Sequence, residues 1–173
     1  MHTQRKRALR TARGFTLIEL MVSFSALLIV LLGFSRMLLS SHMASSTTHE
    51  ATLAKEAARS MIEQLQATNL ADIYPTYKAS QEASGFEVRG LEAPLDDADG
   101  KPGRILFPEQ GGALSELVVR PQYGWPMDMD RDGDAASANV SATYRRLPVV
   151  VLVEWRGSGG DGIVEFKTVI GGM

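Results

Sequence analysis

The sequence predicts an α+β fold in which a long N-terminal helix packs on a small antiparallel sheet. No proline occurs before Pro75, and proline is the residue that most strongly interrupts a helix. Apolar residues between positions 54 and 65 recur at helical spacing, whereas residues 147–170 contain runs typical of strands. The hydrophobic content of 45% and the charged content of 22% are typical of a folded domain.

Residues 1–14 form a basic leader. The leader holds five of the 18 basic residues of the chain and no acidic residue. The rest of the chain therefore has 13 basic and 20 acidic residues, so its net charge is negative. Because nucleic-acid affinity depends on neutralising phosphates, we expect no nucleic-acid partner. The chain has no cysteine, which excludes disulfides and thiolate metal sites.

Residues 15–36 are predicted to be a membrane-spanning helix. From Phe15 to Ser35 the only charged side chain is Glu19, and about 20 apolar residues suffice to cross a bilayer core of roughly 30 Å. The run is too long for a cleaved secretory signal, and no A-x-A-like site follows it. The preceding basic residues indicate a cytoplasmic N-terminus and an exported remainder. A membrane carboxylate costs a few kcal/mol unless it has a partner or lies at headgroup depth, so Glu19 needs an explanation.

The string GFTLIEL at positions 14–20 resembles the N-terminal signature of type IV pilins and of the pseudopilins of type II secretion. The resemblance implies that a prepilin peptidase cuts between Gly14 and Phe15, that Phe15 is then N-methylated, and that the apolar segment stays on the protein. It further implies that Glu19 pairs with the new ammonium of a neighbouring subunit and sets the axial register of a filament. The spacing of one helical turn also leaves pairing within one chain open.

The same resemblance implies a pilin-like fold, other pilin or pseudopilin subunits as partners, and an inner-membrane assembly platform. The chain would then reside in the bacterial inner membrane, with its C-terminal domain in the periplasm, and in a pilus or pseudopilus. Two departures favour a minor subunit. The first is that Arg36 stands where many pilins have a proline, so Gly33 is the expected weak point of the helix. The second is that the C-terminal cysteine pair of many major pilins is absent.

Residues 37–69 are expected to continue the helix as an amphipathic segment that packs on the sheet. A serine- and threonine-rich stretch at 40–49 weakens this pattern. The apolar stripe consists of Ala54, Ala57, Ala58, Met61, Ile62 and Leu65.

Residues 70–173 are predicted to be the exported, β-rich globular domain. It should begin with a turn-rich connection over 70–84. The expected strands are 86–91, 117–120, 147–155 and 163–170, with a hairpin connection at 157–162. Pro148 places the start of its strand at an edge or end of the sheet. In the last strand Val164, Phe166 and Ile170 should share one face, and Glu165 and Lys167 the other.

The acidic run at 128–134 has the D-x-D-x-D-G spacing that opens an EF-hand calcium loop. This pattern predicts a calcium-binding loop with the ligands Asp128, Asp130, Asp132 and Asp134. The twelfth position, however, is Asn139 rather than a bidentate glutamate, so a solvated acidic turn is the alternative. We interpret the second acidic cluster, at 96–100, as a turn.

No arrangement of residues predicts catalysis, and we expect the protein not to be an enzyme. Its three histidines, His2, His42 and His49, lie in the leader or on the predicted helix. The favoured function is a minor type IV pilin. The alternatives are a minor pseudopilin of type II secretion and a monomeric, signal-anchored module for calcium binding or adhesion.

Overall fold

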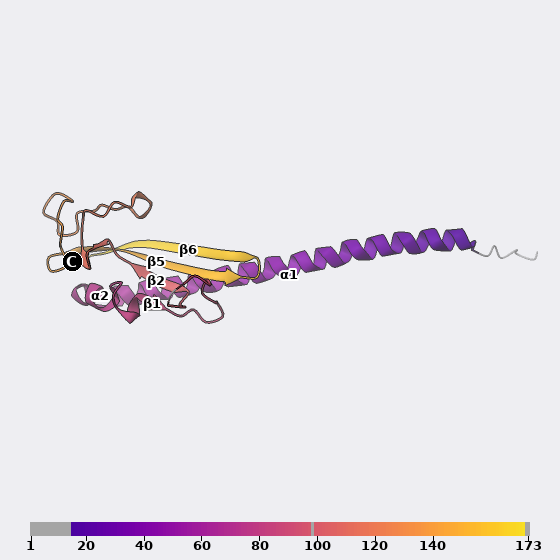
Figure 1. Cartoon of the computed structure of the whole chain (residues 1–173), viewed down its shortest axis with the longest axis horizontal. Helices are drawn as coiled ribbons and strands as arrows, with labels where there is room; N and C mark the ends of the chain where they lie inside the picture. Colours follow the sequence, from indigo (N-terminus) through magenta and orange to yellow (C-terminus); the bar gives the residue numbers. More distant parts are fainter. Residues whose placement is uncertain (1–14, 98, 172–173) are drawn as a thin grey trace, which may run out of the picture. The chain divides into compact units, whose positions relative to one another are not determined.

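The computed structural model describes residues 15–97 and 99–171. The chain divides into two compact units, one ending at His42 and the other beginning at Met43. Helix α1 spans Leu17–Ala67, a single element of 51 residues that begins in the first unit and ends in the second (Figure 1). This confirms the predicted long N-terminal helix.

The serine- and threonine-rich stretch is helical because its hydroxyls bond within the helix. Thr47 Oγ1 donates to the carbonyl oxygen of Met43 at 2.9 Å, and Thr48 Oγ1 donates to that of Ala44 at 2.8 Å. Each hydroxyl thus bonds to the carbonyl four residues back, so it does not compete with the helix for backbone amides.

A second helix, α2, spans Leu70–Tyr77, where a turn-rich connection was predicted. That prediction is wrong for two physical reasons. The side chain of Asn69 accepts a hydrogen bond from the amide of Ala71 at 3.2 Å and caps the helix. Tertiary packing also buries Ile73, Tyr74 and Tyr77, which outweighs the single hydrogen bond that Pro75 removes.

The main sheet has four antiparallel strands in the order β1-β2-β5-β6. Their bounds are β1 Gly85–Phe86, β2 Gly103–Leu106, β5 Arg146–Gly157 and β6 Gly160–Gly171. A separate two-stranded hairpin pairs β3 (Glu109–Gln110) with β4 (Ala113–Leu114). Two 3-10 turns, η1 at Glu82–Ser84 and η2 at Pro121–Tyr123, complete the elements of the described part of the chain.

The two C-terminal strands confirm their predictions, and the hairpin between them is tighter than expected. Gly157 pairs with Gly160, so only Ser158 and Gly159 form the loop. Pro148 pairs with Val169 of β6 but lies beyond the end of the β2 ladder, as predicted for a strand end. The sequence did not predict β2, which is a four-residue strand between Pro102 and Pro108.

Two predicted strands are wrong. In 86–91 only Phe86 is in a strand, because the chain turns at Gly90, whose φ of 87° suits glycine. Residues 117–120 lie in a loop, with Leu117 48% and Val119 69% exposed. The chain turns back at η2, and Arg120 forms an isolated bridge with Trp125 instead of joining the main sheet.

The core lies between the second part of α1 and the sheet, which establishes the predicted α+β, pilin-like arrangement (Figure 1). Ala54, Ala58 and Leu65 of the predicted stripe are fully buried. They pack with side chains of β5, among them Val151 and Val153, and two small alanines allow helix and sheet to approach closely. The other members of the stripe, Ala57, Met61 and Ile62, are partly buried against this core.

The carboxylate of Glu50 ties α1 to the β5–β6 hairpin. It accepts hydrogen bonds from the amide of Ser158 at 3.1 Å and from the indole nitrogen of Trp155 at 3.4 Å. Ser46, one helical turn earlier, donates a third at 3.2 Å. The Ser158 amide is the main reason why the pKa of Glu50 lies below its ordinary value.

We therefore expect Glu50→Gln to reduce the pH dependence of stability. A carboxylate with a lowered folded-state pKa stabilises the fold above its unfolded-state pKa, and this contribution is lost as the pH falls through the folded-state pKa. The variant should be less stable than the wild type at pH 7 and should lose less stability between pH 7 and pH 3. Denaturant unfolding of the full chain in detergent measures both quantities. Glu56→Gln, an exposed carboxylate on the same helix, is the control, and equal pH dependence in both variants would contradict the role of Glu50.

Candidate functional site

The first turn of α1 is closed by the side chain and the backbone of Thr16. Its hydroxyl accepts a hydrogen bond from the amide of Glu19 at 3.3 Å, and its carbonyl accepts one from the amide of Leu20 at 3.1 Å. Thr16 is therefore the N-cap, and Glu19 is the third helical residue. This is the Thr-x-x-Glu spacing of a capping box, a local signal that the sequence analysis missed.

Glu19 thus has a local role besides any partner. A carboxylate in the first turn is favoured by the partial positive charge of the helix N-terminus. Phe15 precedes the cap and lies outside the helix. The predicted cleavage bond joins Phe15 to Gly14, and Gly14 lies outside the described residues.

The part of α1 in the first unit exposes apolar side chains in every direction. Its large apolar residues from Leu17 to Leu39 are all between 45% and 79% exposed. The helix is long and apolar enough to cross a membrane, and none of this stretch is buried within the protein. Ser25 and Ser35 bond back to the carbonyls of Met21 and Leu31 at 2.8 and 2.9 Å, so these hydroxyls need no water. Such a surface requires lipid or other helices around it.

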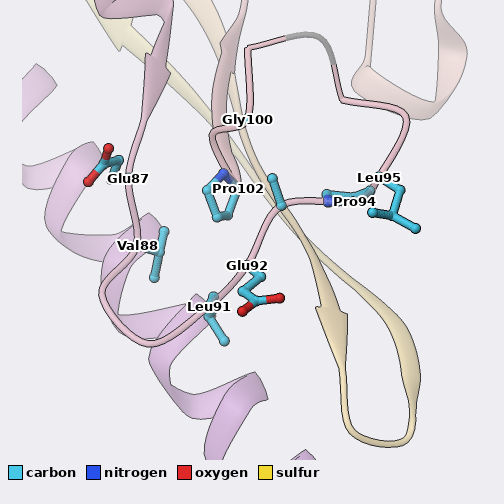
Figure 2. A pocket seen from close by; sticks show the side chains of 9 residues that line it. Glu87, Val88, Leu91, Glu92, Pro94, Leu95, Gly100 and Pro102 are labelled. Carbon is cyan, nitrogen blue, oxygen red and sulfur yellow. The ribbon is translucent and has the colours of Figure 1, made fainter.

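A hollow of about 440 Å³ lies beside the turn that follows β1 (Figure 2). Its charged lining residues are Glu87 and Glu92, and Glu92 forms an ion pair with Arg156 at 2.7 Å. The other described lining residues are glycine, alanine, proline, valine and leucine. This lining offers acids but no nucleophile or base of another kind.

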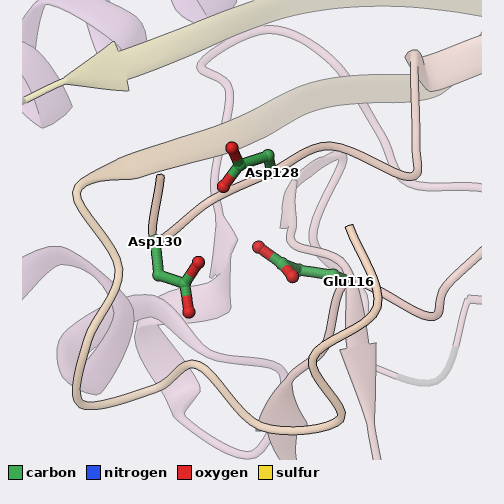
Figure 3. A group of neighbouring side chains, drawn as sticks. All are labelled: Glu116, Asp128 and Asp130. Carbon is green, nitrogen blue, oxygen red and sulfur yellow. The ribbon is translucent and has the colours of Figure 1, made fainter. Parts of the chain in front are cut away.

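Three carboxylates converge in the long segment between β4 and β5. One oxygen each of Glu116, Asp128 and Asp130 lies within 4.8 Å of the others, and the three side chains face a common space (Figure 3). Hard cations such as Ca²⁺ prefer oxygen ligands of this kind. Sequence reasoning missed Glu116, which lies twelve positions before Asp128 and outside the D-x-D-x-D-G pattern.

Glu116 is only 1% exposed and organises the loop around it. Its carboxylate accepts hydrogen bonds from the amide of Met129 and, at 3.1 Å, from that of Ser137. Burial raises the pKa of Asp130, and the negative charges of Asp132, Glu116 and Asp128 raise it further. A cation among these groups would reduce this repulsion.

Asp132 and Asp134 are not part of this group. Asp132 accepts a hydrogen bond from the amide of Asp134 at 3.1 Å, and Asp134 accepts one from the amide of Ala136 at 3.0 Å. Asp128 and Asp130 accept similar bonds, from the amides of Arg131, Gly133 and Asp132. What separates the two pairs is therefore position, because only Asp128 and Asp130 lie close to Glu116. Of the four predicted ligands, the structure brings together only Asp128 and Asp130.

The second acidic cluster, at 96–100, contains a turn, as predicted, and two of its carboxylates pair with an arginine. The amide of Asp97 donates to the carbonyl of Pro94 at 3.2 Å. Arg104 of β2 contacts the carboxylates of Asp97 and Asp99, the latter at 3.6 Å. These acids are therefore already partnered.

Comparison with known proteins identifies the N-terminal segment. Residues 9–35 match the model of the prokaryotic N-terminal methylation motif, which is the type IV pilin and pseudopilin prepilin signal. The match includes the predicted cleavage site, Glu19 and most of the apolar part of α1. No curated protein and no solved structure matches the chain.

Proposed function

We propose that this chain, a type IV pilin- or pseudopilin-like precursor by its prepilin signal, is a minor pilin. A prepilin peptidase cuts between Gly14 and Phe15, Phe15 becomes N-methylated, and the mature chain enters or primes a pilus assembled at the inner membrane. The observation that carries the proposal is the methylation motif over residues 9–35, which coincides with a helix whose apolar surface has no partner within the described chain. The N-terminus is cytoplasmic and the second unit periplasmic.

Assembly depends on helix–helix contacts and on the charge of Glu19. Inside a filament the exposed apolar side chains of α1 pack against those of neighbouring subunits. Glu19 pairs with the ammonium of Phe15 on a neighbour and fixes the axial register, because an unpaired carboxylate in an apolar bundle is costly. Phe15 lies one residue before the cap, so pairing of Glu19 with the ammonium of its own chain is the alternative that this geometry leaves open.

The absence of a proline at Arg36 and of a C-terminal cysteine pair supports a minor subunit rather than the main building block. The same features fit a minor pseudopilin of a type II secretion system, which is the alternative function. Both would be processed in the same way and would use the same assembly platform. A monomeric anchored module, in contrast, would keep its leader.

We further propose that the loop between β4 and β5 binds calcium through Glu116, Asp128 and Asp130. The support is the convergence of these carboxylates around a buried glutamate that links Met129 and Ser137. A bound Ca²⁺ would neutralise the acidic centre and hold the loop to the sheet. Compared with the ligands predicted from the sequence, this set contains Glu116 in place of Asp132 and Asp134.

The first prediction from the proposed function concerns processing. In cells with an active prepilin peptidase, mass spectrometry of the membrane-extracted protein should find a chain that starts at N-methylated Phe15. Deletion of the peptidase should leave the chain starting at Met1. A leader that persists in the presence of the peptidase would exclude both the pilin and the pseudopilin function.

The second prediction separates the two roles of Glu19. Glu19→Gln keeps a residue suited to a capping box but removes the charge, so processing and folding should be unchanged while incorporation into filaments falls severely. Thr16→Ala, the control, removes the cap hydroxyl and leaves the charge, so filaments should still form. Immunoblots of sheared filaments measure incorporation, and wild-type levels for Glu19→Gln would refute the ion-pair role.

The third prediction concerns calcium. Added Ca²⁺ should raise the melting temperature of the full chain, since a ligand at a hundred times its Kd stabilises the folded state by about 2.7 kcal/mol. Asp130→Asn should abolish the shift, whereas Asp132→Asn should retain it because Asp132 lies outside the proposed ligand set. No shift for the wild type at millimolar Ca²⁺ would leave the loop an acidic turn.

A further inference from the structure

Strand β6 is a long free edge of the main sheet. It pairs with β5 along all 12 of its residues, and within residues 15–97 and 99–171 no strand lies on its other side (Figure 1). In the described chain no backbone group of β6 bonds to anything outside that ladder. A free edge of this length can accept another strand.

The amides and carbonyls of the odd-numbered residues point to this free edge. A two-residue hairpin is closed by a hydrogen-bonded pair, here Gly157 and Gly160, and such pairs alternate with non-bonded ones along an antiparallel ladder. The even-numbered residues therefore bond to β5, and the odd-numbered residues are available to a partner.

The side chains of the odd-numbered residues lie on the outer face, and their pattern is self-complementary about Phe166. Ile163 is 57% exposed and Val169 47% exposed, and between them stand Glu165 and Lys167. Their order is apolar, acidic, basic, apolar, with Phe166 at the centre. The even-numbered Val164 and Phe166 instead pack against the core on the inner face.

We propose that β6 pairs antiparallel with β6 of a second copy of this chain, about a two-fold axis at Phe166. Ile163 then lies opposite Val169 of the other copy, and Glu165 opposite Lys167, on both sides of the axis. All of these are odd-numbered positions, so the backbone groups at the free edge meet as hydrogen-bonded pairs. The contact is isologous and closes at two copies, so it is separate from helix-mediated filament assembly.

The charges select this register. A shift that centres the pair on Glu165 sets Glu165 against Glu165, and one that centres it on Lys167 sets lysine against lysine. Like charges directly opposite destabilise a sheet, whereas opposite charges stabilise it. A shift by one residue sets the odd-numbered residues of one copy opposite the even-numbered residues of the other, whose backbone groups already bond to β5, so the hydrogen bonds between the copies are lost. Lysine on an edge strand usually discourages pairing, but here its opposite position carries a carboxylate.

The outer face of β6 already holds Lys167 in place. Its Nζ donates to the carbonyl of Gln122 at 2.6 Å, lies 5.7 Å from the centre of the Tyr123 ring and 3.6 Å from Glu165 of the same strand. The side chains of Glu165 and Lys167 nevertheless remain 34% and 46% exposed. Both charged side chains are thus held by contacts yet accessible at the centre of this self-complementary pattern.

Cysteine cross-linking tests the register, because the natural chain contains no cysteine. In the full chain in its membrane, Ile163→Cys/Val169→Cys should form a reducible covalent dimer under mild oxidation. Paired Cα atoms lie about 5.5 Å apart in such a ladder, within the roughly 4.4–6.8 Å that a disulfide spans. Ile163→Cys alone is the control, since its two copies would lie about 20 Å apart. No dimer for the double variant, or equal dimer for the control, would overturn the proposal.

Charge exchange tests the pairing itself in the same cysteine background. Glu165→Lys and Lys167→Glu should each lose the cross-link, because each sets like charges opposite one another. Coexpression of the two single variants, and the combined Glu165→Lys/Lys167→Glu chain, should both restore it. Lys55→Glu and Glu56→Lys, exposed on α1, are matched controls that should retain it. A cross-link that persists in every charge variant would indicate association through the apolar helix and would overturn the proposal.

Discussion

The structure depends on one constraint: α1 must satisfy two different surroundings along its length. Up to Leu39 its apolar side chains point in all directions and remain exposed, so this part is stable only among lipids or other helices. Beyond Met43 the apolar residues of α1 lie on a single stripe along the helix, and the sheet covers this stripe. Between the two parts, threonine hydroxyls bond back to the helix, so the backbone remains helical where the pattern is weakest.

The second unit is organised by β5, which is buried on both faces. Its core face packs with Ala54 and Ala58 of α1, while Val150 and Leu152 on the other face are also shielded from solvent. Strand β5 is bonded on one side to β2 and on the other to β6, and this leaves β6 at the border of the sheet. The long chain segment before β5 lies outside the main sheet and is held by scattered backbone hydrogen bonds and by side chains.

Three side chains help to hold that segment without any disulfide. The buried carboxylate of Glu116 links Met129 and Ser137, and Tyr144 Oη donates to the carbonyl of Leu70 at 2.8 Å. On the outer face of the sheet, Lys167 bonds to the carbonyl of Gln122. A buried carboxylate is costly unless it is hydrogen-bonded, and Glu116 meets this condition through two backbone amides. The same side chain therefore both organises the loop and supplies a ligand to the proposed cation site.

The sequence by itself determined the features that depend on local pattern. The basic leader, the GFTLIEL string, the unbroken helix and the two C-terminal strands all follow from composition, short motifs or periodicity within one segment. Tertiary structure decided the rest, because those features depend on residues far apart in the chain. Helix α2 forms despite Pro75 since its tyrosines are buried, and Val118 and Val119 form no strand since the chain turns back after Arg120, which bridges Trp125. Likewise, Glu116 joins Asp128 and Asp130 only because the fold of the loop brings them together, and no local spacing could have paired them.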